Sequence, residues 1–330
     1  MYENFFGLEK SPFLLVPDPN CVHLTAQHGD AISGLVFGIL DRRGYLVLTG
    51  EAGLGKTTAL GALAQLTATS NVQCSLIFNP TLTAPEFLEM VLLKFGFQQI
   101  PSSKPQRLDV LQKFLLQSDA AGRISALIID EAHKLSPELL EEVRLLGNFE
   151  ASDHKLLQIV LVGQNELNDR LNLPDLWQLK QRIAIRMSLQ RLDRQNVEDY
   201  VRFRWNKAGG AGAFPFSDSA IDGIASWSNG VPRLINVICD NALLVAFSQE
   251  ARTVDLAQVR EACKELDLPT PAITRPATRP GPVTVSRPAQ PQPPVPPPDA
   301  ERPVVSSGPK TSGWIDSRPS LLKRWLRLTD

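Results

Sequence analysis

The chain has 330 residues, a hydrophobic fraction of 43% and a formal net charge of −1. This composition is ordinary for a soluble protein with a packed core, and the length allows more than one structural unit. A net charge so close to zero argues against a protein that is basic overall and binds nucleic acid through its whole surface, although a local basic patch remains compatible with it.

The first 30 residues form a proline-punctuated segment that we expect to be irregular. A helix is predicted over 30–40, and short apolar runs typical of buried strands then alternate with helical patterns. The predicted strands cover 45–49, 73–78, 126–130 and 157–162, and the predicted helices cover 56–69, 85–94, 107–117 and 137–149. This alternation predicts an α/β core, residues 31–190, in which helices cover a parallel sheet.

After about Asp193 the sequence no longer shows strand patterns. Helical patterns at 196–207, 218–228, 231–247 and 255–266 predict a small all-helical lid domain over 191–267. The composition then changes sharply, because residues 269–309 hold more than half of the chain's 26 prolines. A segment of this kind cannot bury a core, so residues 268–316 are predicted to be a disordered proline-rich linker.

The last residues, 317–330, regain an apolar periodicity. Leucines and Trp325 recur at helical spacing with lysine and arginine on the other side, which predicts a short, basic amphipathic helix. A helix this short is marginal alone, and we expect it to fold against a partner groove or an anionic membrane surface. The helix would thus tether the chain to the partner, or client, on which it acts. A disordered end, or a helix docked on the rest of the chain, is the alternative.

The four cysteines are far apart and form no CxxC pair, which argues against a zinc site and against a disulfide framework. The N-terminus lacks the basic residues of a signal peptide. No apolar run approaches the roughly 20 residues of a transmembrane helix. We therefore expect a cytoplasmic protein, held at most peripherally at the inner membrane.

The segment YLVLTGEAGLGKTTAL places a glycine-rich loop directly after a predicted strand and at the start of a predicted helix. The backbone N–H groups of such a loop wrap the phosphates of a nucleotide, and the helix N-terminus favours the negative charge. Lys56 is predicted to reach the β- and γ-phosphates, and the Thr57 hydroxyl to coordinate Mg²⁺. The residues predicted to bind ATP are Gly50, Glu51, Ala52, Gly53, Leu54, Gly55, Lys56, Thr57 and Thr58.

A pair of acids, Asp130 and Glu131, ends the apolar run SALII. An acid at this place in a P-loop protein holds the Mg²⁺ shell, so Asp130 joins Thr57 as a predicted metal ligand. The adjacent Glu131 is the predicted general base that orients and deprotonates the attacking water. The string DEAH also occurs in a helicase group, but no second helicase domain follows, and His133 is given a role in the local turn.

Three further polar side chains are candidates for catalytic roles. Gln164 follows the strand at 157–162, where it can sense the γ-phosphate or the water; a turn role is the alternative. Arg182, or else Arg186, can act as an arginine finger in a neighbouring subunit, and a surface salt bridge is the alternative. Arg233, at the start of a helix after a Gly-Val-Pro turn, can close onto the γ-phosphate; the alternative is a surface arginine.

Together these segments resemble the bacterial general secretion pathway protein A family, whose members are AAA+ ATPases related to the origin-recognition and transposition ATPases. The resemblance covers about residues 1–266 with its motifs in order. It is carried by YENFFGLEKSPF, VPDPN, HLTAQHGDAISGLVFGI, GEAGLGKTT, IIDEAHKLSPELLEEVRLLGNFE, LLQIVLVGQNEL, LKQRIAIRMSL and NGVPRLINVICDNALLVAF.

The resemblance implies that ATP hydrolysis is coupled to a bacterial envelope export system, such as type II secretion, a pilus or exopolysaccharide machinery. It also implies a homo-oligomer, a first-sensor role for Gln164, a second-sensor role for Arg233, and a position near the adenine for the stretch Leu24–His28. The family's secretion members carry a membrane span and a peptidoglycan-binding domain where this chain has a proline-rich tail, and Asn165 stands where proline is expected.

Two other functions compete with this hypothesis. A DNA-associated ATPase, such as a transposition regulator or a helicase loader, shares the same core. The net charge and the absence of a recognisable basic reading helix argue against it. A nucleotide switch that does not hydrolyse ATP is disfavoured by the intact Lys56, Asp130 and Glu131.

Overall fold

A computed structural model describes residues 2–14, 25–68, 70–78, 82–210 and 212–270. The predicted proline-rich linker, apart from its first residues, and the predicted C-terminal helix lie outside the described residues. Within the described part, none of the helices has the length and apolar character needed to cross a membrane.

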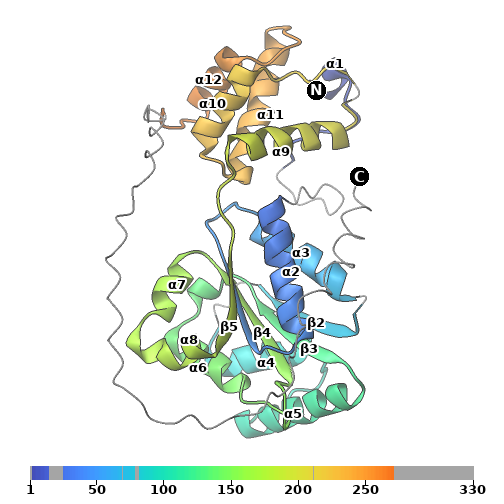
Figure 1. Cartoon of the computed structure of the whole chain (residues 1–330), viewed down its shortest axis with the longest axis vertical. Helices are drawn as coiled ribbons and strands as arrows, with labels where there is room; N and C mark the ends of the chain where they lie inside the picture. The colour runs from blue at the N-terminus through green and yellow to red at the C-terminus, as the bar shows by residue number, and fades with distance from the viewer. Residues whose placement is uncertain (1, 15–24, 69, 79–81, 211, 271–330) are drawn as a thin grey trace, which may run out of the picture. The chain divides into compact units, whose positions relative to one another are not determined.

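The first structural unit is a five-stranded parallel sheet with the order β2-β3-β4-β1-β5. Its strands are β1 (Tyr45–Thr49), β2 (Val72–Ile77), β3 (Ile124–Ile129), β4 (Leu157–Gly163) and β5 (Ile183–Ser188). Because the strands are parallel, their carboxyl ends share one edge of the sheet. The loops that follow β1, β4 and β3 are therefore neighbours there (Figure 1).

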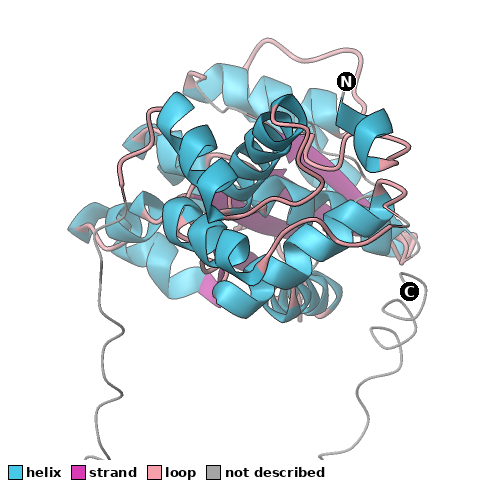
Figure 2. Cartoon of the chain, turned by 90° about the horizontal axis from the view of Figure 1, so that it is seen from above, coloured by secondary structure: helices cyan, strands magenta, loops and turns pink. Residues whose placement is uncertain are grey.

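Helices cover both faces of this sheet, so the strands run between two helical layers (Figures 1 and 2). Side chains alternate along a strand, and in β1 Leu46 and Leu48 point to one face while Tyr45 and Val47 point to the other. The first face packs against α2 (Ala26–Leu40) and α3 (Lys56–Ala68). The second packs against α4 (Ala84–Lys94), α5 (Lys104–Ala120) and α6 (Pro137–Leu146). Apolar residues on both faces explain why the strands are continuous hydrophobic runs.

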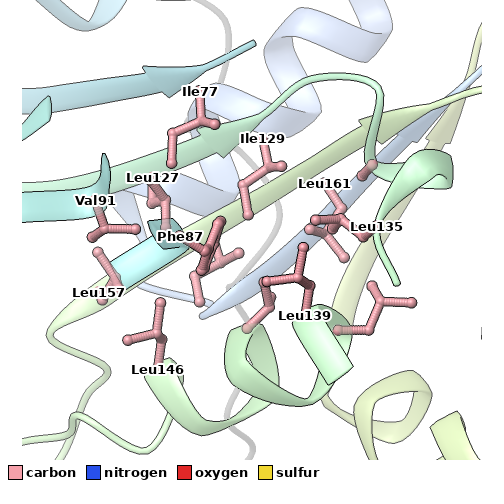
Figure 3. Close-up of a cluster of buried hydrophobic side chains, with 14 of the residues drawn as sticks. Ile77, Phe87, Val91, Leu127, Ile129, Leu135, Leu139, Leu146, Leu157 and Leu161 are labelled. Carbon is pink, nitrogen blue, oxygen red and sulfur yellow. The ribbon is translucent and has the colours of Figure 1, made fainter. Parts of the chain in front are cut away.

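The larger of the two sheet cores gathers Phe87 of α4, Leu139 of α6, and Leu127, Ile129 and Leu161 of the sheet (Figure 3). These side chains are fully or almost fully buried, with exposed fractions of at most 2%. In a core packed this densely, a substitution that shortens a buried side chain lowers the stability of the fold.

Replacing Leu161 with alanine is therefore expected to lower the free energy of unfolding by about 2–5 kcal/mol, because a cavity is left at a site that is 0% exposed. Leu116, on α5, is 46% exposed and provides a matched control, for which the same replacement should cost less than about 0.5 kcal/mol. Urea denaturation measures both values. Equal losses in the two variants would contradict the assignment of Leu161 to the core.

The chain after the sheet is helical and consists of α9 (Arg194–Lys207), α10 (Asp218–Ser228), α11 (Pro232–Ser248) and α12 (Leu256–Glu265). Their apolar faces share one core, to which Tyr2, Leu8 and Phe13 of the N-terminal segment also contribute. Arg204 fixes this segment by donating from Nε to the Pro12 carbonyl at 2.7 Å. The N-terminal residues thus belong to the packing of the helical segment although they lie far from it in sequence.

The structure corrects several sequence-based expectations. The N-terminal segment is not irregular throughout, because α1 (Tyr2–Phe6) forms there and α2 begins at Ala26. The edge strand β5 was not predicted as a strand, since only alternate residues are partly buried and Arg186 interrupts the apolar pattern. Two single-turn helices, α7 (Glu166–Leu171) and α8 (Trp177–Arg182), also escaped prediction, because they are too short to show a period.

Candidate functional site

The glycine-rich loop lies between β1 and α3, as the sequence predicts. Gly53 and Gly55 have φ values of +82° and +92°, a backbone region that favours glycine. A Cβ atom on Gly53 would lie 3.0 Å from Arg233 Cβ, and one on Gly55 would lie 3.1 Å from His28 Nε2. Conformation and crowding therefore both favour glycine at these positions. The loop leads directly into the N-terminus of α3, where unpaired N–H groups attract anions.

Lys56 is the first residue of α3 and is buried, with 6% of its surface exposed. Its ammonium group donates to the carbonyls of Gly50 at 2.7 Å and Glu51 at 2.9 Å. Burial lowers the pKa of Lys56, whereas the negative charges of Glu131, Asp130 and Glu166 act in the opposite direction. The amine is thus held against the loop, where it can exchange its carbonyl partners for phosphate oxygens.

Asp130 follows β3 and is also buried, with 4% exposed. Burial is the largest cause of its raised pKa, and the charge of Glu131 adds to it. Its Oδ1 accepts from the Glu131 N–H at 2.8 Å, and its Oδ2 lies 3.4 Å from the Thr57 hydroxyl, which donates to it. β3 and β1 lie on either side of β4, so the Asp130 carboxylate at the end of β3 meets the Thr57 hydroxyl at the start of α3, which follows β1.

The pair Thr57 and Asp130 suits Mg²⁺, which takes oxygen ligands and is commonly held by one or two protein groups together with phosphates and waters. Among the described residues, no cluster of three or more His, Cys, Asp or Glu side chains could hold a metal by itself.

Glu131 has the left-handed conformation, with φ +55°, and opens the short 3₁₀ turn Ala132–Lys134. An L-residue in this conformation is uncommon and is found where the surrounding structure enforces it. The side chain is 31% exposed, and its Oε2 lies 3.0 Å from Lys134 Nζ and 3.7 Å from His133 Nε2. The carboxylate is thus partly open to solvent beside the buried Asp130.

Gln164 directly follows Gly163, which pairs with Thr49 of β1. Its backbone N–H donates to His133 Nδ1 at 3.2 Å, and its side-chain amide lies 3.3 Å from His133 Nε2. Sequence analysis gave His133 only a local turn role. The structure shows instead that its ring joins the turn after β3 to the end of β4, a long-range contact that sequence spacing does not reveal.

The three arginines lie in different places. Arg233 is beside the glycine-rich loop, and its backbone N–H donates to the Gly53 carbonyl at 3.4 Å. Arg182 precedes β5 at the amino-end edge of the sheet, since Ile183 pairs with the first residue of β1. Its guanidinium donates to the Arg144 carbonyl at 3.1 Å and to Asn148 Oδ1 at 2.7 Å. Arg186 lies within β5 and is exposed. Neither Arg182 nor Arg186 therefore belongs to the set of groups around Lys56.

Two contacts to the loop were not singled out from the sequence as interactions. His28, which is 6% exposed, donates from Nε2 to the Leu54 carbonyl at 3.0 Å, and Thr25 Oγ1 lies 2.8 Å from its Nδ1. Burial lowers the pKa of His28, which favours the neutral ring. Arg191 forms a second contact through a two-pronged ion pair with Glu51, with the shortest distance 2.7 Å. Leu24, the other end of the predicted adenine-side stretch, lies outside the described residues.

The chain is similar to a known domain family and to a curated protein. Residues 39–171 match the AAA domain family. The chain is 40% identical over 270 residues to general secretion pathway protein A of Aeromonas hydrophila, a match that covers 81% of this chain and 48% of that protein. The chain therefore spans about half the length of this curated relative.

Solved structures with the same fold include the Cdc6p protein of Pyrobaculum aerophilum, at 19% identity and a TM-score of 0.59 over 77% of this chain and 70% of that one. The Aeropyrum pernix ORC2 protein aligns at 16% identity and a TM-score of 0.57 over 78% of this chain and 72% of that one. Drosophila ORC aligns at 18% identity and a TM-score of 0.60 over 78% of this chain and 65% of that one. These likenesses establish the α/β fold with its parallel sheet.

Proposed function

The chain carries an AAA domain and is a relative of general secretion pathway protein A, and from this premise we propose that it hydrolyses ATP to ADP and phosphate. The observation that carries the proposal is the convergence of Lys56, Thr57, Asp130 and Glu131 where β1 and β3 end. A binding loop, a pair of metal ligands and an adjacent, partly exposed carboxylate are the groups that phosphoryl transfer to water requires.

In the proposed reaction the loop residues 50–58 hold the phosphates through backbone N–H groups, and Lys56 donates to the β- and γ-phosphate oxygens. Thr57 and Asp130 would hold Mg²⁺, which would supply charge stabilisation to the phosphates when bound. Glu131 accepts a proton from the attacking water. At the same time the water oxygen forms a bond to the γ-phosphorus, and the bond between the γ-phosphorus and the ADP oxygen breaks. Gln164 and Arg233 are the proposed donors to the γ-phosphate.

We further propose that hydrolysis drives the assembly or operation of a bacterial envelope export system. The support is the 40% identity to general secretion pathway protein A. A strain that lacks this chain tests the proposal: wild-type chain should restore assembly of the envelope complex, and the Glu131→Gln variant should not. Restoration by both proteins would refute the requirement for hydrolysis.

A DNA-associated ATPase is the second candidate, because the fold is shared with Cdc6p and ORC structures, of which the Drosophila one is bound to DNA. Binding to duplex DNA would show an affinity that falls steeply as salt concentration rises. Fluorescence anisotropy with labelled duplexes at several salt concentrations decides between the two candidates. We expect no specific complex at physiological salt.

A role for Arg182 in ATP hydrolysis requires a homo-oligomeric active form, because this arginine precedes β5 at the amino-end edge of the sheet, away from the groups around Lys56 in its own subunit. We propose that Arg182 reaches the nucleotide of a neighbouring subunit. The Arg182→Ala variant is then expected to lose roughly 10³-fold or more in turnover. Mixing it with the Lys56→Ala variant should restore part of the activity, since a Lys56→Ala subunit still donates its Arg182 to an intact site.

The Arg186→Ala variant is the matched control, because this arginine lies only four residues away in the exposed part of β5. Steady-state phosphate release at several mixing ratios measures the effect. If activity never rises on mixing, or if the Arg186→Ala variant behaves as predicted for Arg182→Ala, the assignment of the finger to Arg182 is wrong.

A further inference from the structure

His133 lies between the two groups proposed to act on the water and the γ-phosphate. Its Nε2 atom lies 3.3 Å from the side-chain amide of Gln164 and 3.7 Å from Glu131 Oε2. The ring is largely buried, with 12% of the side chain exposed. His133 lies in the 3₁₀ turn Ala132–Lys134, which directly follows Asp130 and Glu131. This turn brings its ring back toward the end of β4.

The hydrogen bonds of the ring determine where its proton lies. The Gln164 backbone N–H donates to Nδ1 at 3.2 Å, so Nδ1 must be the acceptor nitrogen and carry no proton. A neutral imidazole has one N–H, which is therefore on Nε2. The Gln164 side-chain nitrogen is the atom placed 3.3 Å from His133 Nε2. Two donors cannot share a hydrogen bond, so the hydrogen-bond pattern assigns the Gln164 oxygen, not the NH₂ group, to this position.

The surrounding structure holds the ring in this position. Arg170 donates from its guanidinium to the His133 carbonyl. Gly163 leaves room for the ring, because a Cβ atom there would lie 3.3 Å from His133 Nδ1 and 3.2 Å from the His133 backbone nitrogen. The orientation of the ring is thus fixed from the backbone side, and its Nε2–H has a defined direction.

From this geometry we infer that His133 is a positioning residue that fixes the side-chain amide of Gln164 with its NH₂ group free for the γ-phosphate. The inference rests on the proposed ATP hydrolysis. Phosphate oxygens only accept hydrogen bonds, so an amide that presents its NH₂ group stabilises the transferring phosphoryl group, whereas an amide that presents its oxygen repels it. Without the Nε2–H of His133 the amide is free to adopt either orientation.

The His133→Asn variant separates this role from a structural one. The asparagine oxygen can still accept from the Gln164 backbone N–H in place of Nδ1, but no group replaces Nε2–H. We expect kcat to fall roughly 10- to 100-fold with unchanged ATP affinity, because a displaced catalytic group slows chemistry without removing binding contacts. The His133→Gln variant places an amide N–H near the position of Nε2 and should recover part of the loss.

A double-mutant cycle with Gln164→Ala shows whether His133 acts through the amide. In the Gln164→Ala background, the change of His133 to asparagine should have no further effect on kcat. An equal fall in both backgrounds, or a fall confined to ATP affinity, would overturn the inference.

The tautomer is a readout that does not depend on ATPase activity. In the full-length chain labelled with ¹⁵N-histidine, the signal of His133 can be assigned by its loss in the His133→Asn variant, since the chain has only 4 histidines. We expect a protonated Nε2 and an unprotonated Nδ1. A proton on Nδ1 would overturn the inference even if ATP is hydrolysed. Absence of hydrolysis with the expected tautomer would instead refute the proposed function.

Discussion

Replacing Lys56 with alanine is expected to weaken ATP binding by roughly a hundredfold or more, because a charge-assisted hydrogen bond to phosphate contributes about 1.5–3 kcal/mol and this amine is predicted to make two. The loss is large also because the positive charge of Lys56 offsets the negative charges of Glu131, Asp130 and Glu166, which act to raise its pKa. Without it, these three carboxylates would repel the incoming triphosphate. Isothermal titration calorimetry with a slowly hydrolysed ATP analogue measures the affinity.

Lys113→Ala is a matched control for the loss of a positive charge. Its side chain is 69% exposed on α5 and pairs with Asp109 at 2.8 Å. The control should bind the analogue with wild-type affinity. Equal affinity in the wild-type and Lys56→Ala chains would show that the glycine-rich loop does not bind the nucleotide as proposed.

The second large effect is expected for Glu131→Gln, which should bind ATP with near wild-type affinity and lose roughly 10²–10⁴-fold in turnover. The amide keeps the shape of the side chain but cannot accept a proton from water. The backbone at Glu131 is left-handed, with φ +55°. Glutamate and glutamine have the same side-chain shape and are strained equally in this conformation, so the local fold should be preserved. Single-turnover phosphate release, with the affinity measured alongside, separates chemistry from binding.

Glu265→Gln provides the comparison. Glu265 is exposed at the end of α12, and its replacement removes the same negative charge. It should leave turnover unchanged. Wild-type turnover in the Glu131→Gln chain would exclude Glu131 as the base, and lost affinity in that variant would point to a binding role instead.

The strand-loop-helix arrangement around the glycine-rich loop could be predicted from sequence because its information is local. The glycine spacing, the preceding strand and the following helix occur within one short segment, and the structure places Gly53, Gly55 and Lys56 accordingly. The three central strands β1, β3 and β4 were predicted for a similar reason, since strands buried on both faces are continuous apolar runs, and the edge strand β2 was predicted as well. The edge strand β5 lacks such a run and was missed.

The contacts that cross between strands could not be predicted in the same way. Sequence analysis separated His133 from Gln164, which lies 31 positions later, and no local pattern shows that a ring after β3 meets the end of β4. The order β3-β4-β1 makes them neighbours. The Glu51–Arg191 ion pair spans 140 positions and was missed for the same reason. Such contacts depend on topology, which composition and periodicity only constrain.

The central claim is that this chain hydrolyses ATP with the groups that converge at the ends of β1 and β3. Its most direct test is the Mg²⁺-dependent release of phosphate from ATP by the purified full-length chain, with the Lys56→Ala variant prepared in parallel. We predict sustained release by the wild-type chain that EDTA stops, and only background release by the variant. Equal rates in the two preparations, or no release by a wild-type chain that binds ATP across a range of protein concentrations, would contradict the account.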